Sequence, residues 1–81
     1  LPQEDGIMRL VIFDIPEQHR QKRIWIRREL VGCNFKMLQK SVWLGKRPLP
    51  NAFMETLKDL NLETFVHIVG IESIGTISIV D

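Results

Sequence analysis

The period of the apolar positions changes several times along the chain, and each change marks the boundary of a predicted element. Residues 8–14 form a nearly continuous apolar run, which predicts a strand buried on much of both faces. After Pro16 the period becomes helical, because Ile26, Leu30 and Cys33 recur at i, i+4 and i+7. We therefore expect a helix that begins at Pro16 and ends near Cys33.

The middle of the chain predicts two short strands, or one strand with a break, followed by a second helix. Residues 35–45 alternate between apolar and polar side chains until the polar stretch "QKS" interrupts them. Pro50 suits the first position of a helix whose core stripe is Phe53, Leu57 and Leu60.

Two asparagines mark the expected ends of the helices. Asn34 follows Cys33 and Asn61 follows Leu60, and asparagine tolerates the left-handed conformation that commonly ends a helix. Residues 64–69 then predict another strand, and residues 76–80 a short strand at the end of the chain.

The order of these elements predicts a ferredoxin-like α+β fold. It is β-α-β-β-α-β with an extra C-terminal strand, which gives an antiparallel sheet of four to five strands with two helices on one face. Such a sheet leaves its other face and its edges exposed, and this favours a homodimer. We expect residues 1–81 to be one domain of a longer protein, because the chain begins at Leu1 without a methionine.

The composition excludes several classes of protein. The chain is 44% hydrophobic, yet no apolar run approaches the roughly 20 residues of a membrane span, and the polar start does not resemble a signal peptide. The single cysteine rules out an internal disulfide, and Cys33 has no zinc-like spacing to His19 or His67. A reducing, cytoplasmic location is the simpler interpretation, with Cys33 in the core and His67 as a partly buried structural residue.

The net charge of +1 hides a polarised chain. Residues 1–47 carry ten of the eleven Lys and Arg and five of the ten acids, so they hold a charge of +5, whereas residues 48–81 hold −4. This pattern favours either one positive face for nucleic acid or a solvated basic helix. The candidate contacts to phosphates are Arg20, Lys22, Arg23, Arg27, Arg28 and Lys40.

Four short motifs resemble one superfamily. "DG" before the first strand, "VIFDIPE", "LQKSVW" and "RPLP" are similar to CRISPR-associated protein 2, and more closely to the central domain of PaaX-like (phenylacetic-acid-type) transcriptional repressors, over roughly residues 5–70. The resemblance implies a homodimer that works with nucleic acid. In the repressor branch, an upstream winged helix would recognise DNA, and this domain would dimerise and relay an effector signal.

In the CRISPR branch, the resemblance assigns a role to Asp14. Two copies of this residue would face each other across the dimer and hold a Mg²⁺ ion for an RNase or DNase, or the domain would only bridge integrase subunits during spacer acquisition. From the residues alone, Asp14 is either such a metal-binding and catalytic carboxylate or a turn residue that accepts backbone N–H bonds.

Apolar residues outside the core stripe mark a candidate interface. Asn34 stands where the family usually has glycine, Glu29 at a usually apolar position, and Ile24, Trp25 and Val31 where the family tends to be charged. Exposed apolar side chains indicate contact with another domain or subunit, or simply scattered surface apolarity. The candidate interface residues are Ile24, Trp25 and Val31 of the helix and Thr76, Ile77 and Ile79 of the tail.

Three functions remain open. The first is a dimerising, nucleic-acid-associated regulator domain without enzymatic activity. The second is the metal-dependent endonuclease or structural bridge, and the third is an interaction domain whose basic helix docks an acidic protein. Trp43 is either a core residue or a platform on which a base stacks.

Overall fold

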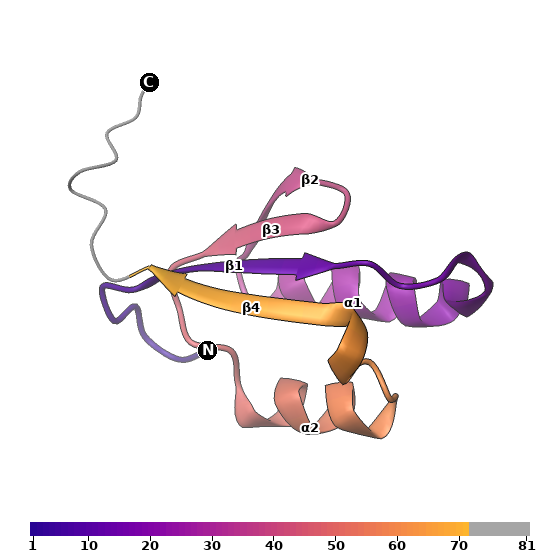
Figure 1. Ribbon diagram of the computed structural model, residues 1–81. Helices are drawn as coiled ribbons and strands as arrows, with labels where there is room; N and C mark the ends of the chain where they lie inside the picture. The colour runs from indigo at the N-terminus through magenta and orange to yellow at the C-terminus, as the bar shows by residue number, and fades with distance from the viewer. Residues whose placement is uncertain (72–81) are drawn as a thin grey trace.

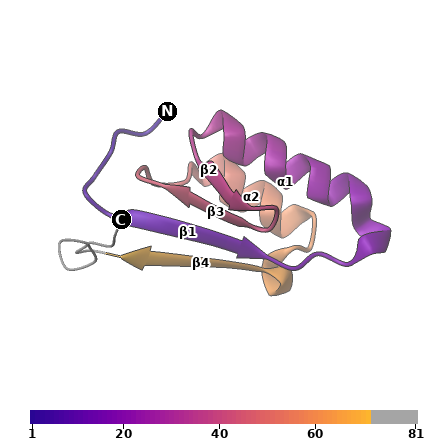
Figure 2. The ribbon, with the colours of Figure 1, turned by 90° about the horizontal axis from the view of Figure 1, so that it is seen from above.

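The chain folds into a four-stranded antiparallel sheet with two α-helices against one of its faces (Figures 1 and 2). A computed structural model describes residues 1–71. The strand order is β2-β3-β1-β4, with β1 in the centre, which confirms the ferredoxin-like fold. The elements are β1 (Met8–Phe13), the 3₁₀ turn η1 (Glu17–His19), α1 (Arg20–Gly32), β2 (Lys36–Gln39), β3 (Val42–Gly45), α2 (Asn51–Asp59), the 3₁₀ turn η2 (Glu63–Phe65) and β4 (Val66–Ile71).

The core lies between the sheet and the helices. Val11 of β1 pairs with Trp43 of β3, and Phe13 pairs with Val66 of β4. Residues directly opposite each other in antiparallel strands share a face, so these four buried side chains point toward the helices. The helical segments add the expected buried residues, Ile26, Leu30, Cys33, Phe53 and Leu57.

The end of α1 has the predicted left-handed asparagine. Asn34 has a φ of 64°, and its amide N donates to the carbonyl of Val31 at 3.0 Å. The next amide, that of Phe35, donates to the carbonyl of Leu30 at 2.9 Å. This pair of hydrogen bonds is the Schellman motif, and it brings the buried Phe35 and Leu30 together.

The end of α2 repeats the same arrangement. Asn61 has a φ of 58° and donates to the carbonyl of Lys58 at 2.9 Å, while the amide of Leu62 donates to the carbonyl of Leu57 at 3.0 Å. Leu62 is fully buried, so this motif also directs the chain back toward the sheet.

The helix starts differ by a few residues from the expected ones. The first α-helix begins at Arg20, because η1 precedes it and His19 has non-helical backbone angles. Pro50 is extended (ψ 150°) and lies just before α2, not at its first position. Residues 35–45 contain two separate strands, β2 and β3, which confirms the first of the two predictions for this segment and not the single strand with a break.

Trp25 lies between the helices. Its ring stacks on that of Phe53 of α2, with centroids 5.4 Å apart and an interplanar angle of 12°. This stacking buries part of the indole against the core and gives its apolar character a role inside the monomer.

The tail strand expected at residues 76–80 lies outside the described residues. Within residues 1–71, no helix is both long and apolar enough to cross a membrane.

Candidate functional site

Asp14 follows the central strand directly and is exposed. Its amide N donates to the carbonyl of Phe65 at 2.9 Å, which fixes the backbone at this point. No group in residues 1–71 donates a hydrogen bond to its carboxylate, so the structure gives no support to the interpretation of Asp14 as a turn residue that accepts N–H bonds.

One chain does not provide a metal site around this carboxylate. Among the described residues, no three side chains of His, Cys, Asp or Glu lie close enough together to hold a metal ion. Mg²⁺ typically needs one or two carboxylates in addition to water or phosphate oxygens. Within residues 1–71, Asp14 is therefore not part of a group of three such ligands.

The outward face of α1 combines arginine and aliphatic side chains. Arg20 and Arg28 are exposed, as is Val31, which is 61% accessible. Arg27 lies between them, and its guanidinium sits 5.9 Å from the centre of the Phe13 ring. These residues share one side of the helix, together with the partly exposed Ile24.

Arg27 connects this face to the β2–β3 hairpin. Its Nε donates to the carbonyl of Lys40 at 3.4 Å, and the indole N–H of Trp43 donates to the same carbonyl at 3.2 Å. Lys40 itself is exposed. The structure thus places the backbone of Lys40 beside Arg27 of α1.

Two of the other candidate bases have partners inside the chain. The Lys22 ammonium donates to the carbonyl of Leu60 at 2.7 Å, and so satisfies the C-terminal end of α2. Arg23 donates through Nη2 to the carbonyl of Glu17 at 3.2 Å, and its Nε is buried. These contacts hold Lys22 and Arg23 against the protein.

The sheet face opposite the helices is apolar, and the described helices leave it uncovered (Figures 1 and 2). Alternation along β1 places Leu10 and Ile12 there, and their partners on the neighbouring strands extend the same face. We call this the helix-free face. Its apolar residues are Met8, Leu10, Ile12, Val42, Leu44, Val69 and Ile71, and the polar residues Lys36, Gln39 and His67 lie on its outer strands.

Sequence reasoning predicted an exposed sheet face but did not name the residues that lie on it. The signal was present, because the nearly continuous apolar run of residues 8–13, interrupted only by Arg9, indicates a strand with apolar side chains on both faces. Of the predicted interface residues on α1, which are Ile24, Trp25 and Val31, Trp25 stacks on Phe53 inside the monomer. The other three, Thr76, Ile77 and Ile79, lie outside the described residues.

Comparison with known families agrees with this geometry. The model of the PaaX protein central Cas2-like domain matches residues 2–78. The chain belongs to this family. A search of curated proteins found no match.

Within this PaaX-type domain, the departures from the usual pattern have structural explanations. Asn34 adopts the positive φ that glycine would otherwise supply. Glu29 is partly exposed, so its carboxylate stays in contact with solvent. Burial, and secondarily Glu29, raise the pKa of the Cys33 thiol, which fits a core residue and not a nucleophile.

Two other single-residue predictions for the PaaX-type domain have clear outcomes. Trp43 is 4% exposed and belongs to the core, which leaves its ring no free side for a base. The prediction of a partly buried His67 is wrong, because this residue is exposed. It lies on the edge strand β4, opposite Ile12 on the helix-free face. An edge strand has a neighbouring strand on one side only, so the side chain stays exposed.

Proposed function

We propose that this domain dimerises through the helix-free face and presents the outward face of α1 to nucleic acid, as the central domain of a PaaX-like transcriptional regulator. The observation that carries the proposal is the apolar sheet face itself, in a member of the family of PaaX central Cas2-like domains. The domain acts by binding.

The helix-free face suits a second copy of the same chain. Leu10, Ile12 and Leu44 lie near its middle, and the polar residues Lys36 and His67 lie on its outer strands. A contiguous apolar patch with a polar margin is typical of an interface, and a two-fold axis lets the same patch serve both partners.

Dimerisation through this face leaves the basic surface free. Helix α1 packs on the opposite side of the sheet (Figure 2), so its outward face stays exposed in both copies. The exposed cations Arg20, Arg28 and Lys40 have no partner among the described residues, and with Arg27 they provide charge for phosphate contacts. Such contacts position a protein on nucleic acid without reading its sequence.

Sedimentation velocity tests the dimer. Leu10→Glu places a charge on the helix-free face and should convert a dimer into a monomer. Val31→Glu adds the same charge at a site that is 61% exposed on α1 and should leave the dimer intact. A monomeric wild-type chain at high concentration would contradict the proposal.

Anisotropy titrations of labelled duplex DNA at several salt concentrations test the basic surface. Arg28→Gln removes one phosphate contact and should reduce the slope of log K against log salt by about 0.9. Lys58→Gln removes one exposed charge from α2 and is the matched control. Equal slopes for the two variants would argue against contact through α1.

The free carboxylate of Asp14 supports a second candidate, a nuclease that holds Mg²⁺ between two copies. This function needs the dimer, because each chain offers one carboxylate at the site. Asp14→Asn should abolish any Mg²⁺-dependent cleavage of RNA or DNA while sedimentation as a dimer is retained. Cleavage that persists in this variant would exclude the candidate.

A further inference from the structure

We propose that Arg27 binds one phosphate of the nucleic-acid backbone through both of its terminal nitrogens, and that Trp43 positions it for this contact through the carbonyl of Lys40. The inference rests on the proposed binding of nucleic acid, and it names the group that gives this binding a fixed geometry. The other cations on the outward face of α1 contribute charge.

The Lys40 carbonyl links the core to the basic surface. The indole N–H of Trp43, a residue that is 4% exposed, donates to this oxygen at 3.2 Å, and Nε of Arg27 donates to it at 3.4 Å. A carbonyl oxygen has two lone pairs and can accept from both donors. Because the close-packed core fixes the Trp43 ring, the oxygen has a fixed position from which it orients Arg27.

The ring of Phe13 is a second anchor for the guanidinium. Its centre lies 5.9 Å from Cζ of Arg27, within the range of a cation–π contact, and Phe13 itself is 2% exposed. With Nε bound to the Lys40 carbonyl and Cζ beside Phe13, the guanidinium is held from two directions. The side chain therefore loses little rotamer freedom when it binds a ligand.

The two terminal nitrogens of Arg27 remain available for a ligand. Neither has a hydrogen-bond partner within residues 1–71, where the only buried side-chain nitrogen without a partner is Nε of Arg23. Both Nη1 and Nη2 of Arg27 are therefore in contact with solvent. Two parallel N–H groups match two oxygens of a phosphate, and lysine cannot reproduce this bidentate geometry.

A phosphate fits this position better than the edge of a base. Arg27 is partly buried, and its Nε is bound to the β2–β3 hairpin, so the guanidinium stays close to the protein surface. Phosphates are the outermost groups of a duplex, whereas base edges lie at the bottom of a major groove about 8.5 Å deep. A recessed arginine reaches the first and not the second. Such a contact fixes the register of the protein on nucleic acid without reading its sequence.

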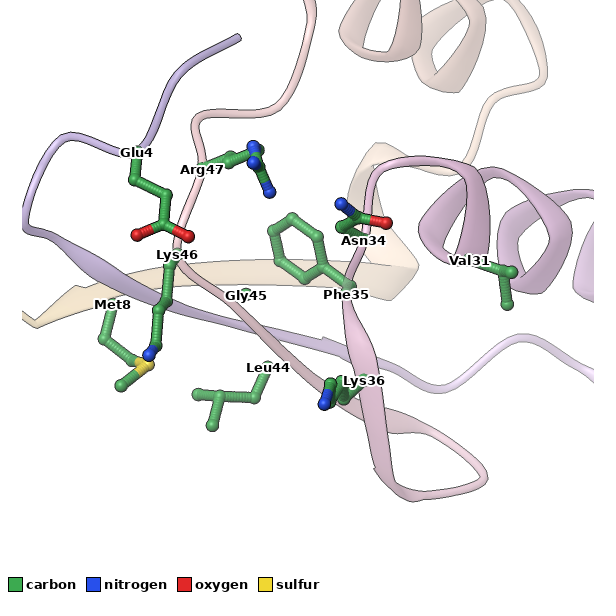
Figure 3. A pocket seen from close by; sticks show the side chains of 10 residues that line it. All are labelled: Glu4, Met8, Val31, Asn34, Phe35, Lys36, Leu44, Gly45, Lys46 and Arg47. Carbon is green, nitrogen blue, oxygen red and sulfur yellow. The ribbon is translucent and has the colours of Figure 1, made fainter. Parts of the chain in front are cut away.

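The cations at the other end of the β2–β3 hairpin do not form a comparable group. Where β2 begins and β3 ends, Lys36 and Lys46 point to one side of the hairpin and Arg47 points to the other (Figure 3). None of the three forms a hydrogen bond or an ion pair within residues 1–71. They supply charge without a defined direction, and so does the exposed Arg28 of α1. Arg28 is therefore the matched control for Arg27.

Anisotropy titrations of labelled duplex DNA separate the geometry of Arg27 from its charge. Arg27→Lys and Arg28→Lys both keep the charge, so both variants should retain the wild-type slope of log K against log salt. Arg27→Lys should nevertheless weaken binding by about fivefold, because one of the two hydrogen bonds to the phosphate is lost. Arg28→Lys should change the affinity by less than about twofold, because its contact depends on charge alone.

A double-mutant cycle tests whether Trp43 acts through Arg27. Trp43→Phe removes the indole N–H but keeps an aromatic ring in the core, and should weaken DNA binding by about threefold in the wild-type background. In the Arg27→Lys background the same change should have less than about a 1.5-fold effect, because the group that it positions is gone. A merely structural role of Trp43 would lower the affinity equally in both backgrounds and would contradict the positioning role.

The outcomes separate this inference from the proposed function. A wild-type chain that binds no duplex, or binds it without dependence on salt, would contradict the proposed function and the inference with it. Salt-dependent binding with equal losses in Arg27→Lys and Arg28→Lys would contradict the inference alone. A loss in Arg27→Lys that occurs only with G·C-rich duplexes would assign Arg27 to a base edge and overturn the phosphate contact. Urea unfolding of each variant shows that folded chains are compared.

Discussion

The ring of Phe35 lies directly over Gly45. A Cβ added at Gly45 would come within 2.5 Å of Cδ1 and Cε1 of that ring. Phe35 is held in place by the Schellman hydrogen bond to Leu30, and Gly45 is paired with Arg9 of the central strand. The contact therefore joins the segment that follows α1 to the end of β3.

Gly45→Ala should destabilise the domain by about 1–3 kcal/mol, because the added methyl group overpacks a fixed aromatic ring. Urea unfolding followed by circular dichroism measures this change. Gly70→Ala is the control, since its Cβ would meet only Cγ2 of Ile7, at 3.5 Å, and should change stability by less than about 0.5 kcal/mol. Similar losses in both variants would show that strand propensity, and not the Phe35 contact, decides the outcome.

Substitutions at the two asparagines should depend on φ. Asn34→Ala and Asn61→Ala should each lower the free energy of unfolding by about 1 kcal/mol, because alanine in the left-handed region places Cβ against the carbonyl oxygen. Asn34→Gly and Asn61→Gly should be neutral or stabilising. Asn51→Ala, in the first turn of α2, is the control. If the alanine variant at either helix end had a higher denaturant midpoint than the glycine variant, the left-handed role of that asparagine would be contradicted.

Lys22 should contribute to stability through α2. Lys22→Met keeps most of the aliphatic chain but removes the 2.7 Å hydrogen bond to the Leu60 carbonyl, and should lower the free energy of unfolding by about 1–2 kcal/mol. Lys58→Met, on the exposed side of α2, should have little effect. Hydrogen exchange provides a local readout, because the last amides of α2 should exchange faster only in the Lys22 variant.

The Asp5–Arg9 ion pair should produce pH dependence at low pH. The guanidinium of Arg9 donates two hydrogen bonds to the Asp5 carboxylate and lowers the pKa of Asp5 from 3.8 to about 2. A folded-state pKa below the unfolded one stabilises the protein above about pH 4, and this contribution is lost as pH falls from about 4 to about 2.

Thermal melts between pH 2 and pH 6, taken at intervals of about half a unit, test this sign. Asp5→Asn and Arg9→Met should each flatten the acid limb of the Tm curve, and the double variant should add little to either. A wild-type Tm that rises as pH falls through this window would contradict the linkage.

The features that sequence predicts well here are those set by local chemistry. Asn34 and Asn61 lie directly after the apolar stripes, so their left-handed conformation follows from neighbouring residues. The helical wheel puts Trp25 outside the core stripe, because it considers one contact face of the helix. In the structure, α1 packs against the sheet and also contacts Phe53 of α2 through Trp25.

Contacts between residues far apart in the chain leave no periodic signal. Lys22 reaches a carbonyl 38 residues away, and nothing in the pattern of charges distinguishes it from the exposed Arg20. His67 sits in an apolar run typical of a buried strand, but the position of β4 at the edge of the sheet depends on the whole topology.

An isotope-filtered nuclear Overhauser experiment on a dimer of labelled and unlabelled chains tests the central claim most directly. If the helix-free face is the interface, intermolecular signals should connect the methyl groups of Leu10, Ile12, Val42 and Leu44 across the two copies. Intermolecular signals that come only from Ile24 and Val31 on α1 would contradict the account and assign the dimer contact to the helical side.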